Sequence, residues 1–68
     1  MGIITSYVIV SGCLGRKESI VTQLRKEGFK VVSIPEIDAI IILNTTERTA
    51  KHVLEALGFS GGKYTEID

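Results

Sequence analysis

The sequence predicts an α+β domain in which two strand–helix–strand units build one sheet. Three observations lead to this class. Short runs of β-branched residues alternate with two amphipathic stretches, and each amphipathic stretch ends at a glycine. The motif Leu-x-x-x-Gly-Phe also occurs twice, at Leu24–Phe29 and at Leu54–Phe59. A chain of 68 residues is long enough for one domain, so we expect a single domain over residues 1–68.

The first half of the chain predicts a strand, a helix and a second strand. The β-branched run Ile3–Val10 predicts a strand that stops at Ser11 and Gly12. A helix is expected over Arg16–Glu27, with Gly28 as the residue that ends it. The helix has one apolar stripe, made of Ile20, Val21 and Leu24. Phe29–Ile34 then predicts the second strand, which Pro35 closes.

The second half predicts the same three elements after a tight turn at Glu36–Asp38. Ala39–Leu43 is a continuous apolar run, typical of a strand covered on both faces. Asn44 is expected to cap the second helix, because an acidic residue follows three positions later. This helix carries its apolar stripe at Ala50, Val53, Leu54 and Leu57 and ends at Gly58. Lys63–Ile67 alternates weakly and predicts a short edge strand.

These elements predict a ferredoxin-like β-α-β-β-α-β fold. Right-handed crossovers place both helices on one face of a four-stranded antiparallel sheet, in strand order 4-1-3-2. The two expected central strands, Ile3–Val10 and Ala39–Leu43, are apolar on both sides. Since a large apolar patch is unusual on a soluble monomer, we expect a second copy or a partner to cover the open face. A small monomer with an adhesive surface is the alternative.

Composition and charge exclude several function classes. Eight basic residues balance eight acidic ones without a charged block, which does not favour nucleic-acid binding. Tyr7 is the one aromatic residue on an expected central strand, so a base-stacking sheet is not indicated. The chain shows no basic segment ahead of its first apolar run and no apolar run near ~20 residues, so we expect a cytoplasmic protein without membrane contact. One cysteine and one histidine supply neither an internal disulfide nor a zinc site, and we expect no cofactor.

The loop between the first strand and the first helix is the candidate ligand site. Two glycines would let a ligand approach the backbone, and amides at a helix N-terminus favour a carboxylate or phosphate. The cations Arg16 and Lys17 would reinforce that preference. A strand-to-helix turn explains the same glycines without a ligand, and that alternative stays open. The candidate site residues are Ser11, Gly12, Cys13, Leu14, Gly15 and Arg16.

No catalytic constellation is evident, and we expect that the chain is not an enzyme. Cys13 lies near a helix N-terminus, where a thiol pKa can fall, but a nucleophile also needs a base. His52 is the one histidine, and its place beside the second apolar stripe favours a surface role. Glu36 and Asp38 are explained by turn chemistry.

The arrangement resembles an ACT domain, a small regulatory module that binds amino acids and related effectors. The resemblance covers nearly the whole chain and rests on the loop glycine Gly15, the interval to Gly28 and the following strand Phe29–Ile34. Where that family usually carries an acidic residue and a proline before the loop glycine, this chain has Gly12 and Leu14. The resemblance implies effector binding near the loop, at a subunit interface, and pairing of subunits through their sheets or edges.

Other ferredoxin-like families share the outline. Peptide-binding chaperones of the nitrate-reductase maturation type fit it. Acylphosphatases share Val10-Ser11-Gly12 but not the remainder of their signature, and the Cys-x-x-Cys of heavy-metal-associated domains is absent.

Two functional hypotheses follow. The first is a homo-oligomeric regulatory module that senses an amino acid or another anionic effector at the loop. The second is a protein-interaction or assembly module that holds a partner on its open sheet face or edge strand.

Overall fold

The order of helices and strands agrees with the sequence prediction. The computed structural model describes residues 6–13 and 15–68. Their elements, in chain order, are β1 (Tyr7–Ser11), α1 (Lys17–Lys26), β2 (Val31–Ile34), β3 (Ala39–Leu43), α2 (Glu47–Ala56) and β4 (Lys63–Ile67). The bounds of β3 and β4 match those predicted. Residues 3–5 of the expected first strand lie outside the described residues.

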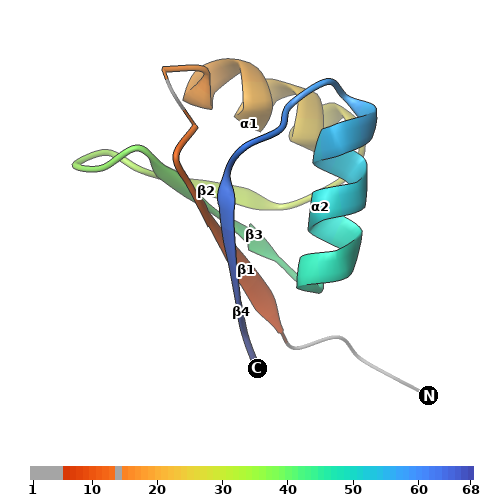
Figure 1. The fold of residues 1–68 in the computed structure, drawn as a ribbon. Coiled ribbons are helices and arrows are strands. Elements are labelled where there is room, and N and C mark those ends of the chain that lie inside the picture. The colour runs from red at the N-terminus through yellow and green to blue at the C-terminus, as the bar shows by residue number, and fades with distance from the viewer. Residues whose placement is uncertain (1–5, 14) are drawn as a thin grey trace.

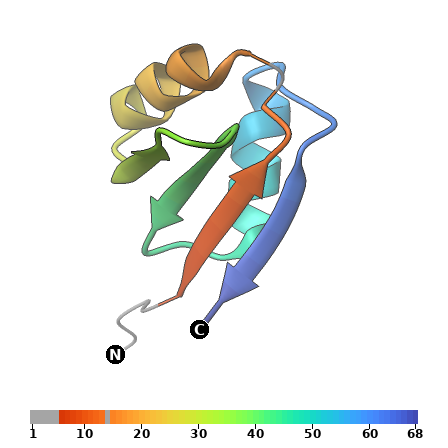
Figure 2. The same ribbon diagram turned by 90° about the vertical axis from the view of Figure 1, so that its left-hand side faces the viewer.

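The four strands form one antiparallel sheet in the order β2-β3-β1-β4, which confirms the predicted ferredoxin-like topology. Strands β1 and β3 occupy the centre, and β4 lies at an edge as expected. Both helices lie on the same face of the sheet (Figure 1). The view at right angles shows the opposite face without a helix over it (Figure 2).

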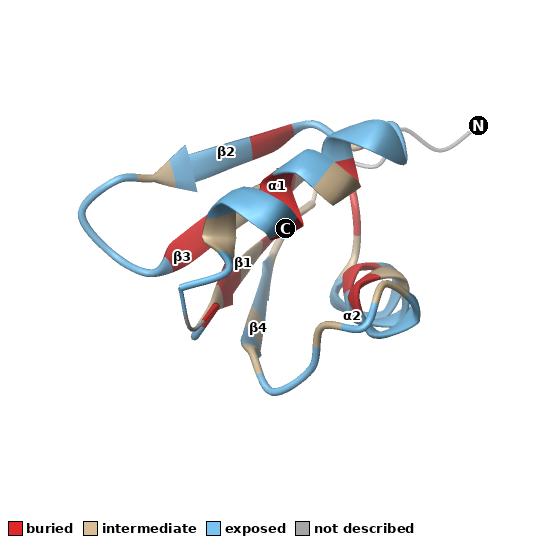
Figure 3. Cartoon of the chain, turned by 90° about the horizontal axis from the view of Figure 1, so that it is seen from above, coloured by how far each residue is buried: buried red, intermediate tan, exposed pale blue. Residues whose placement is uncertain are grey.

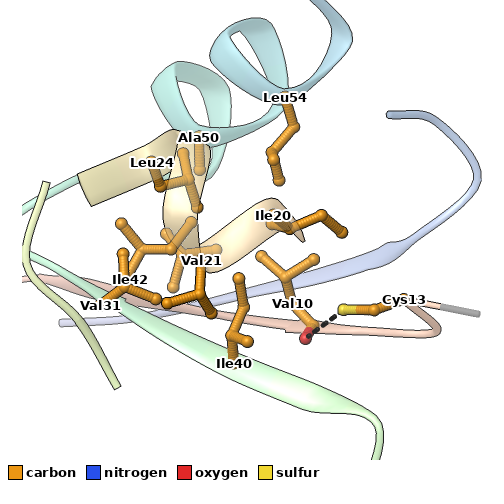
Figure 4. Close-up of a cluster of buried hydrophobic side chains, with 11 residues drawn as sticks. Val10, Cys13, Ile20, Val21, Leu24, Val31, Ile40, Ile42, Ala50 and Leu54 are labelled. Carbon is orange, nitrogen blue, oxygen red and sulfur yellow. Dashed lines mark hydrogen bonds between the residues drawn. The ribbon is translucent and has the colours of Figure 1, made fainter. Parts of the chain in front are cut away.

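The core lies between the two helices and the covered sheet face (Figure 3). Val8 and Val10 of β1 are paired with Ile42 and Ile40 of β3, and all four are buried. Side chains of both helices point into the same cluster, as Figure 4 shows. Each buried aliphatic side chain contributes about 1.5–3 kcal/mol relative to an exposed one. The helix residues of the core are Ile20, Val21, Leu24, Ala50 and Leu54.

Helix α1 ends in a Schellman motif at Gly28. The φ angle of Gly28 is 94°, a left-handed value that glycine adopts without steric cost. Its N–H donates to the carbonyl oxygen of Arg25 (3.1 Å), and the Phe29 N–H donates to that of Leu24 (3.0 Å). Because the Phe29 N–H belongs to the helix end, β2 begins at Val31 and not at Phe29 as predicted.

Helix α2 ends in the same way, which explains the repeated sequence motif. Gly58 has a φ angle of 88°, and its N–H donates to the carbonyl oxygen of Glu55 (3.0 Å). The Phe59 N–H donates to the carbonyl oxygen of Leu54 (2.9 Å). In both halves the phenylalanine then packs against the core. The glycine provides the left-handed backbone angle that ends the helix, and the phenylalanine anchors the segment that follows to the core.

The start of α2 differs from the prediction, because the N-cap is Thr46 and not Asn44. Thr46 has an extended backbone (φ −111°, ψ 162°), and its Oγ1 accepts the N–H of Thr49 (3.3 Å). Asn44 instead has a φ angle of 55°, a left-handed conformation that asparagine tolerates better than most residues. Thr45 follows it with its N–H donated to the carbonyl oxygen of Ser6 (3.1 Å). The chain therefore needs two residues, Asn44 and Thr45, to leave β3 before the cap of the helix.

Candidate functional site

The candidate loop is a compact turn between β1 and α1. Ser11 ends β1, and Gly12 follows with a φ angle of 76° and its N–H donated to the carbonyl oxygen of Asp38 (3.1 Å). Cys13 is buried, and its carbonyl oxygen accepts the N–H of Arg16 (3.0 Å). Gly15 has a φ angle of 77° and is exposed. Leu14 lies outside the described residues. Both glycines therefore have backbone angles that a strand-to-helix turn uses, and the ligand site in this loop stays a prediction.

The two cations next to the loop already contact groups of the chain itself. Arg16 is the N-cap residue of α1, so the helix begins at Lys17, one position later than predicted. The Arg16 guanidinium lies over the ring of Phe59, 5.3 Å from the centroid. The Lys17 Nζ donates to the carbonyl oxygens of Ile34 and, at 2.8 Å, Ile37. Lys17 thus ties α1 to the β2–β3 turn, and its ammonium is not aimed at a ligand in the loop.

A shallow hollow lies beside the loop. Its cavity volume is about 20 Å³, far below the 300–1,000 Å³ usual for small-molecule pockets. Gly62 lies close to the backbone of β1 at one side of the hollow, since a Cβ at this position would lie 3.1 Å from the carbonyl oxygen of Ser11. The hollow brings together both chain halves; its residues are Val10, Gly12, Cys13, Arg16, Ile20, Leu54, Phe59, Ser60, Gly62 and Tyr64.

The thiol of Cys13 is a buried structural group. Its Sγ donates to the carbonyl oxygen of Val10 at 3.9 Å (Figure 4). Burial raises the pKa of this thiol, the Asp38 carboxylate raises the pKa further, and Lys17 lowers it. A thiol with a raised pKa holds little thiolate at neutral pH, which does not favour a nucleophile. His52 is exposed on α2, beside Arg48 and Thr49.

The open sheet face is the second candidate site. The strand registers place three cross-strand rows on it, and the middle row reads Val32, Ile41, Ile9 and Thr65 across the sheet. Val32 is 47% exposed, whereas Ile9 and Ile41 are half-buried by their neighbours on the same face. By register, the apolar residues of this face are Tyr7, Ile9, Val32, Ile34, Ala39, Ile41, Leu43 and Ile67, of which Ala39 is buried.

Such a face is unusual for a sheet that meets water. Antiparallel strands with one solvated face normally alternate apolar and polar residues, as β4 does with Lys63 and Thr65. Strands β1 and β3 place apolar side chains on both faces instead. We call the eight apolar residues together with Ser11, Lys63 and Thr65 the open face. Its apolar composition is typical of a surface that binds another protein surface.

An arginine side chain covers part of the β2 edge of the sheet. The carbonyl oxygen of Lys30 accepts the Leu43 N–H (2.9 Å), so by alternation the Val31 carbonyl points away from the sheet. The Arg25 guanidinium donates to this Val31 oxygen (2.9 Å) and covers part of the β2 edge. Arginine in this position makes strand addition at β2 less favourable than contact with the open face.

Sequence reasoning found the central part of the open face but missed its edges. The apolar residues of β1 and β3 carried the prediction, whereas Val32 and Ile34 of β2 and Ile67 of β4 were not assigned to it. The signal was present, because Val31 and Val32 are adjacent and one of them must face away from the helices. The contact of Arg16 with Phe59 joins the two halves and has no local sequence signal.

Comparison with known proteins adds no family: no family model, no curated protein and no solved structure matches the chain. Within residues 6–13 and 15–68, no cluster of three or more His, Cys, Asp or Glu side chains could hold a metal ion. The helices of this same part of the chain are too short and too polar to cross a bilayer.

Proposed function

We propose that this chain is a protein-interaction module that receives an apolar segment of a partner on its open face. The observation that carries the proposal is the run of apolar side chains across all four strands of a sheet whose helices lie on the other side. Burial of such a surface stabilises a complex by about 25 cal/mol per Å² of apolar area, before the costs of association.

The size of the open face suits a segment better than a whole domain. Four strands of about five residues span roughly 19 Å by 17 Å, a footprint of about 300 Å². A standard protein–protein interface buries about 800 Å² per partner. The footprint is a projected area and the interface value is an accessible surface area, but a second globular copy would need contacts beyond this face to form an interface of standard size. The expected self-association stays a prediction.

The test compares what copurifies with two variants that carry the same chemical change. Ile9→Thr with Ile41→Thr alters a cross-strand pair at the centre of the open face and keeps the β-branched side chains. Ile37→Thr is the matched control, because Ile37 is 56% exposed in the β2–β3 turn, off the open face. We expect a polypeptide that stays with the wild type and the control and is lost with the double variant. Equal retention by all three proteins would contradict the proposal.

A small-molecule role at the first loop is the second candidate. The left-handed backbone of Gly12 and Gly15 favours it, because two residues without side chains let a ligand approach the chain just before α1. An ACT-like module would use this site to bind an amino acid or another anion. A small molecule that copurifies, with no polypeptide, would favour this candidate over the first.

A further inference from the structure

The charges around the open face are all of one sign. Lys63 pairs with Ser11, and its neighbour Tyr64 packs against the core on the helix side, so Lys63 belongs to the open face. Lys30 lies between Phe29 and Val31, both of which pack on the helix side. By the same alternation Lys30 extends the open face beside Leu43, whose N–H its carbonyl accepts.

The acidic residues all lie elsewhere. The eight carboxylates of the sequence are distributed over the helices, the β2–β3 turn and the region around the chain end. Glu66 lies on β4, but its Oε1 accepts the N–H of Glu47 (2.7 Å) at the start of α2, which places its side chain on the helix side. The others are Glu18, Glu27, Glu36, Asp38, Glu47, Glu55 and Asp68. Among residues 6–13 and 15–68, the open face therefore carries Lys30 and Lys63 and no acidic residue.

The two lysines lie on opposite sides of an apolar band. In the sheet order, the band runs diagonally from Ile34 on β2 through Ile41 and Ile9 to Ile67 on β4, and the lysines occupy the other two corners. Three strand spacings and four residues of rise make each diagonal about 20 Å long. A segment that lies along the band would have one lysine beside each of its flanks.

From this arrangement we infer that the partner segment is apolar along one side and acidic on both flanks. The inference rests on the proposed function and specifies its partner. A second copy of the chain is a poorer occupant, since two open faces would bring four lysines and no carboxylate together. Opposite charges at the rim of an interface raise the association rate and select among partners more than they add affinity.

The test uses three synthetic peptides of about 14 residues with the same apolar residues and with Glu, Gln or Lys at the flanking positions. Each of the three is made in two versions. In one the apolar residues alternate, which suits an extended bound form, and in the other they lie at i, i+3, i+4 and i+7, which suits a helical one. Binding to the full chain is followed by NMR shifts of the amides of β1 and β3 at 20 mM and 300 mM salt. Vesicles containing phosphatidylserine are a fourth probe.

We expect the Glu peptide to bind roughly fivefold more tightly than the Lys peptide at low salt, as two exposed ion pairs allow, and the difference to shrink at high salt. In the variant Lys30→Gln with Lys63→Gln the preference should vanish. In the matched control, Lys26→Gln with Lys51→Gln, it should persist, because these lysines lie on α1 and α2.

Four outcomes would overturn the inference, and they separate it from the proposed function. Equal binding of all three peptides, lost with Ile9→Thr and Ile41→Thr, would leave the proposed function standing and remove the acidic preference. Tighter binding of the Lys peptide would reverse that preference. Binding to vesicles alone would assign the face to a membrane surface. The absence of shifts with every peptide at 1 mM, beside a dimer in sedimentation equilibrium, would refute both and assign the face to a second copy.

Discussion

The Gly28→Ala substitution tests how the sequence specifies this fold. Gly28 has a φ angle of 94°, and a Cβ built there would have nothing within 4 Å. The cost therefore comes from backbone strain and not from a clash. A left-handed alanine costs about 1–2 kcal/mol, which the lower entropy of the unfolded chain offsets by about 0.4–1 kcal/mol. We expect a net loss of roughly 1 kcal/mol.

Thermal unfolding by circular dichroism is a suitable assay for a loss of this size. With about 2.1 cal/mol/K of unfolding entropy per residue, a 68-residue chain loses about 7 °C of Tm for each kcal/mol. Gly58→Ala should behave alike, since Gly58 has a φ angle of 88° and equal space around it. The two sites end different helices, so their effects should add.

A D-alanine at position 28 is the matched control for Gly28→Ala. The D-residue favours positive φ, so it has no backbone strain at this position. It still lowers the entropy of the unfolded chain, and it should therefore raise the free energy of unfolding by about 0.5–1 kcal/mol. The chain is short enough for chemical synthesis. If L-alanine left the Tm unchanged or raised it, or if both enantiomers lowered it equally, Gly28 would not be a left-handed helix terminus.

Three further predictions concern the helix start, the buried thiol and the first loop. Thr46→Ala should cost about 1 kcal/mol in urea unfolding because it removes the cap on Thr49, whereas Asn44→Gly should be nearly neutral; the reverse order would restore Asn44 as the cap. Because burial raises the pKa of Cys13, the unfolded chain releases the thiol proton first, so stability should fall as the pH rises above the ordinary thiol pKa of 9.0. Cys13→Ala should reduce that decline; Tyr64, whose pKa is raised mainly by burial, adds a further fall at higher pH, and a flat profile would contradict the burial of both groups. If the loop binds an anionic effector, Gly15→Val should abolish a thermal-shift hit from a panel of amino acids, nucleotides and organic acids, and Arg16→Ala should weaken it; a hit that survives Gly15→Val would place the site elsewhere.

Local signals account for the parts of the fold that sequence reasoning predicted correctly. Strands β3 and β4 have sharp compositional boundaries, and Gly28 and Gly58 mark helix ends because few other residues adopt their backbone angles. The errors arose where two local signals compete. Asn44 and Thr46 are both good caps, and the choice between them depends on how many residues the chain needs to leave β3, which is a tertiary constraint.

The candidate sites show the same division. The loop from Ser11 to Arg16 was visible because glycines cluster there, but the partners of its cations were not. Lys17 reaches carbonyl oxygens of the β2–β3 turn and Arg16 reaches Phe59, and both contacts join segments far apart in the sequence. The apolar character of the open face was predictable for the central strands. Its lysine corners required the strand register, which no single strand sequence contains.

Site-specific photo-cross-linking in the cell tests most directly whether the open face is the binding surface. A benzophenone amino acid would replace Val32, which is 47% exposed on that face, or Lys51, which is exposed on α2. We expect a discrete cross-linked product from position 32, heavier than twice the 7.4 kDa chain, and none from position 51. Equal yields at the two positions, or a product from position 51 alone, would contradict the account.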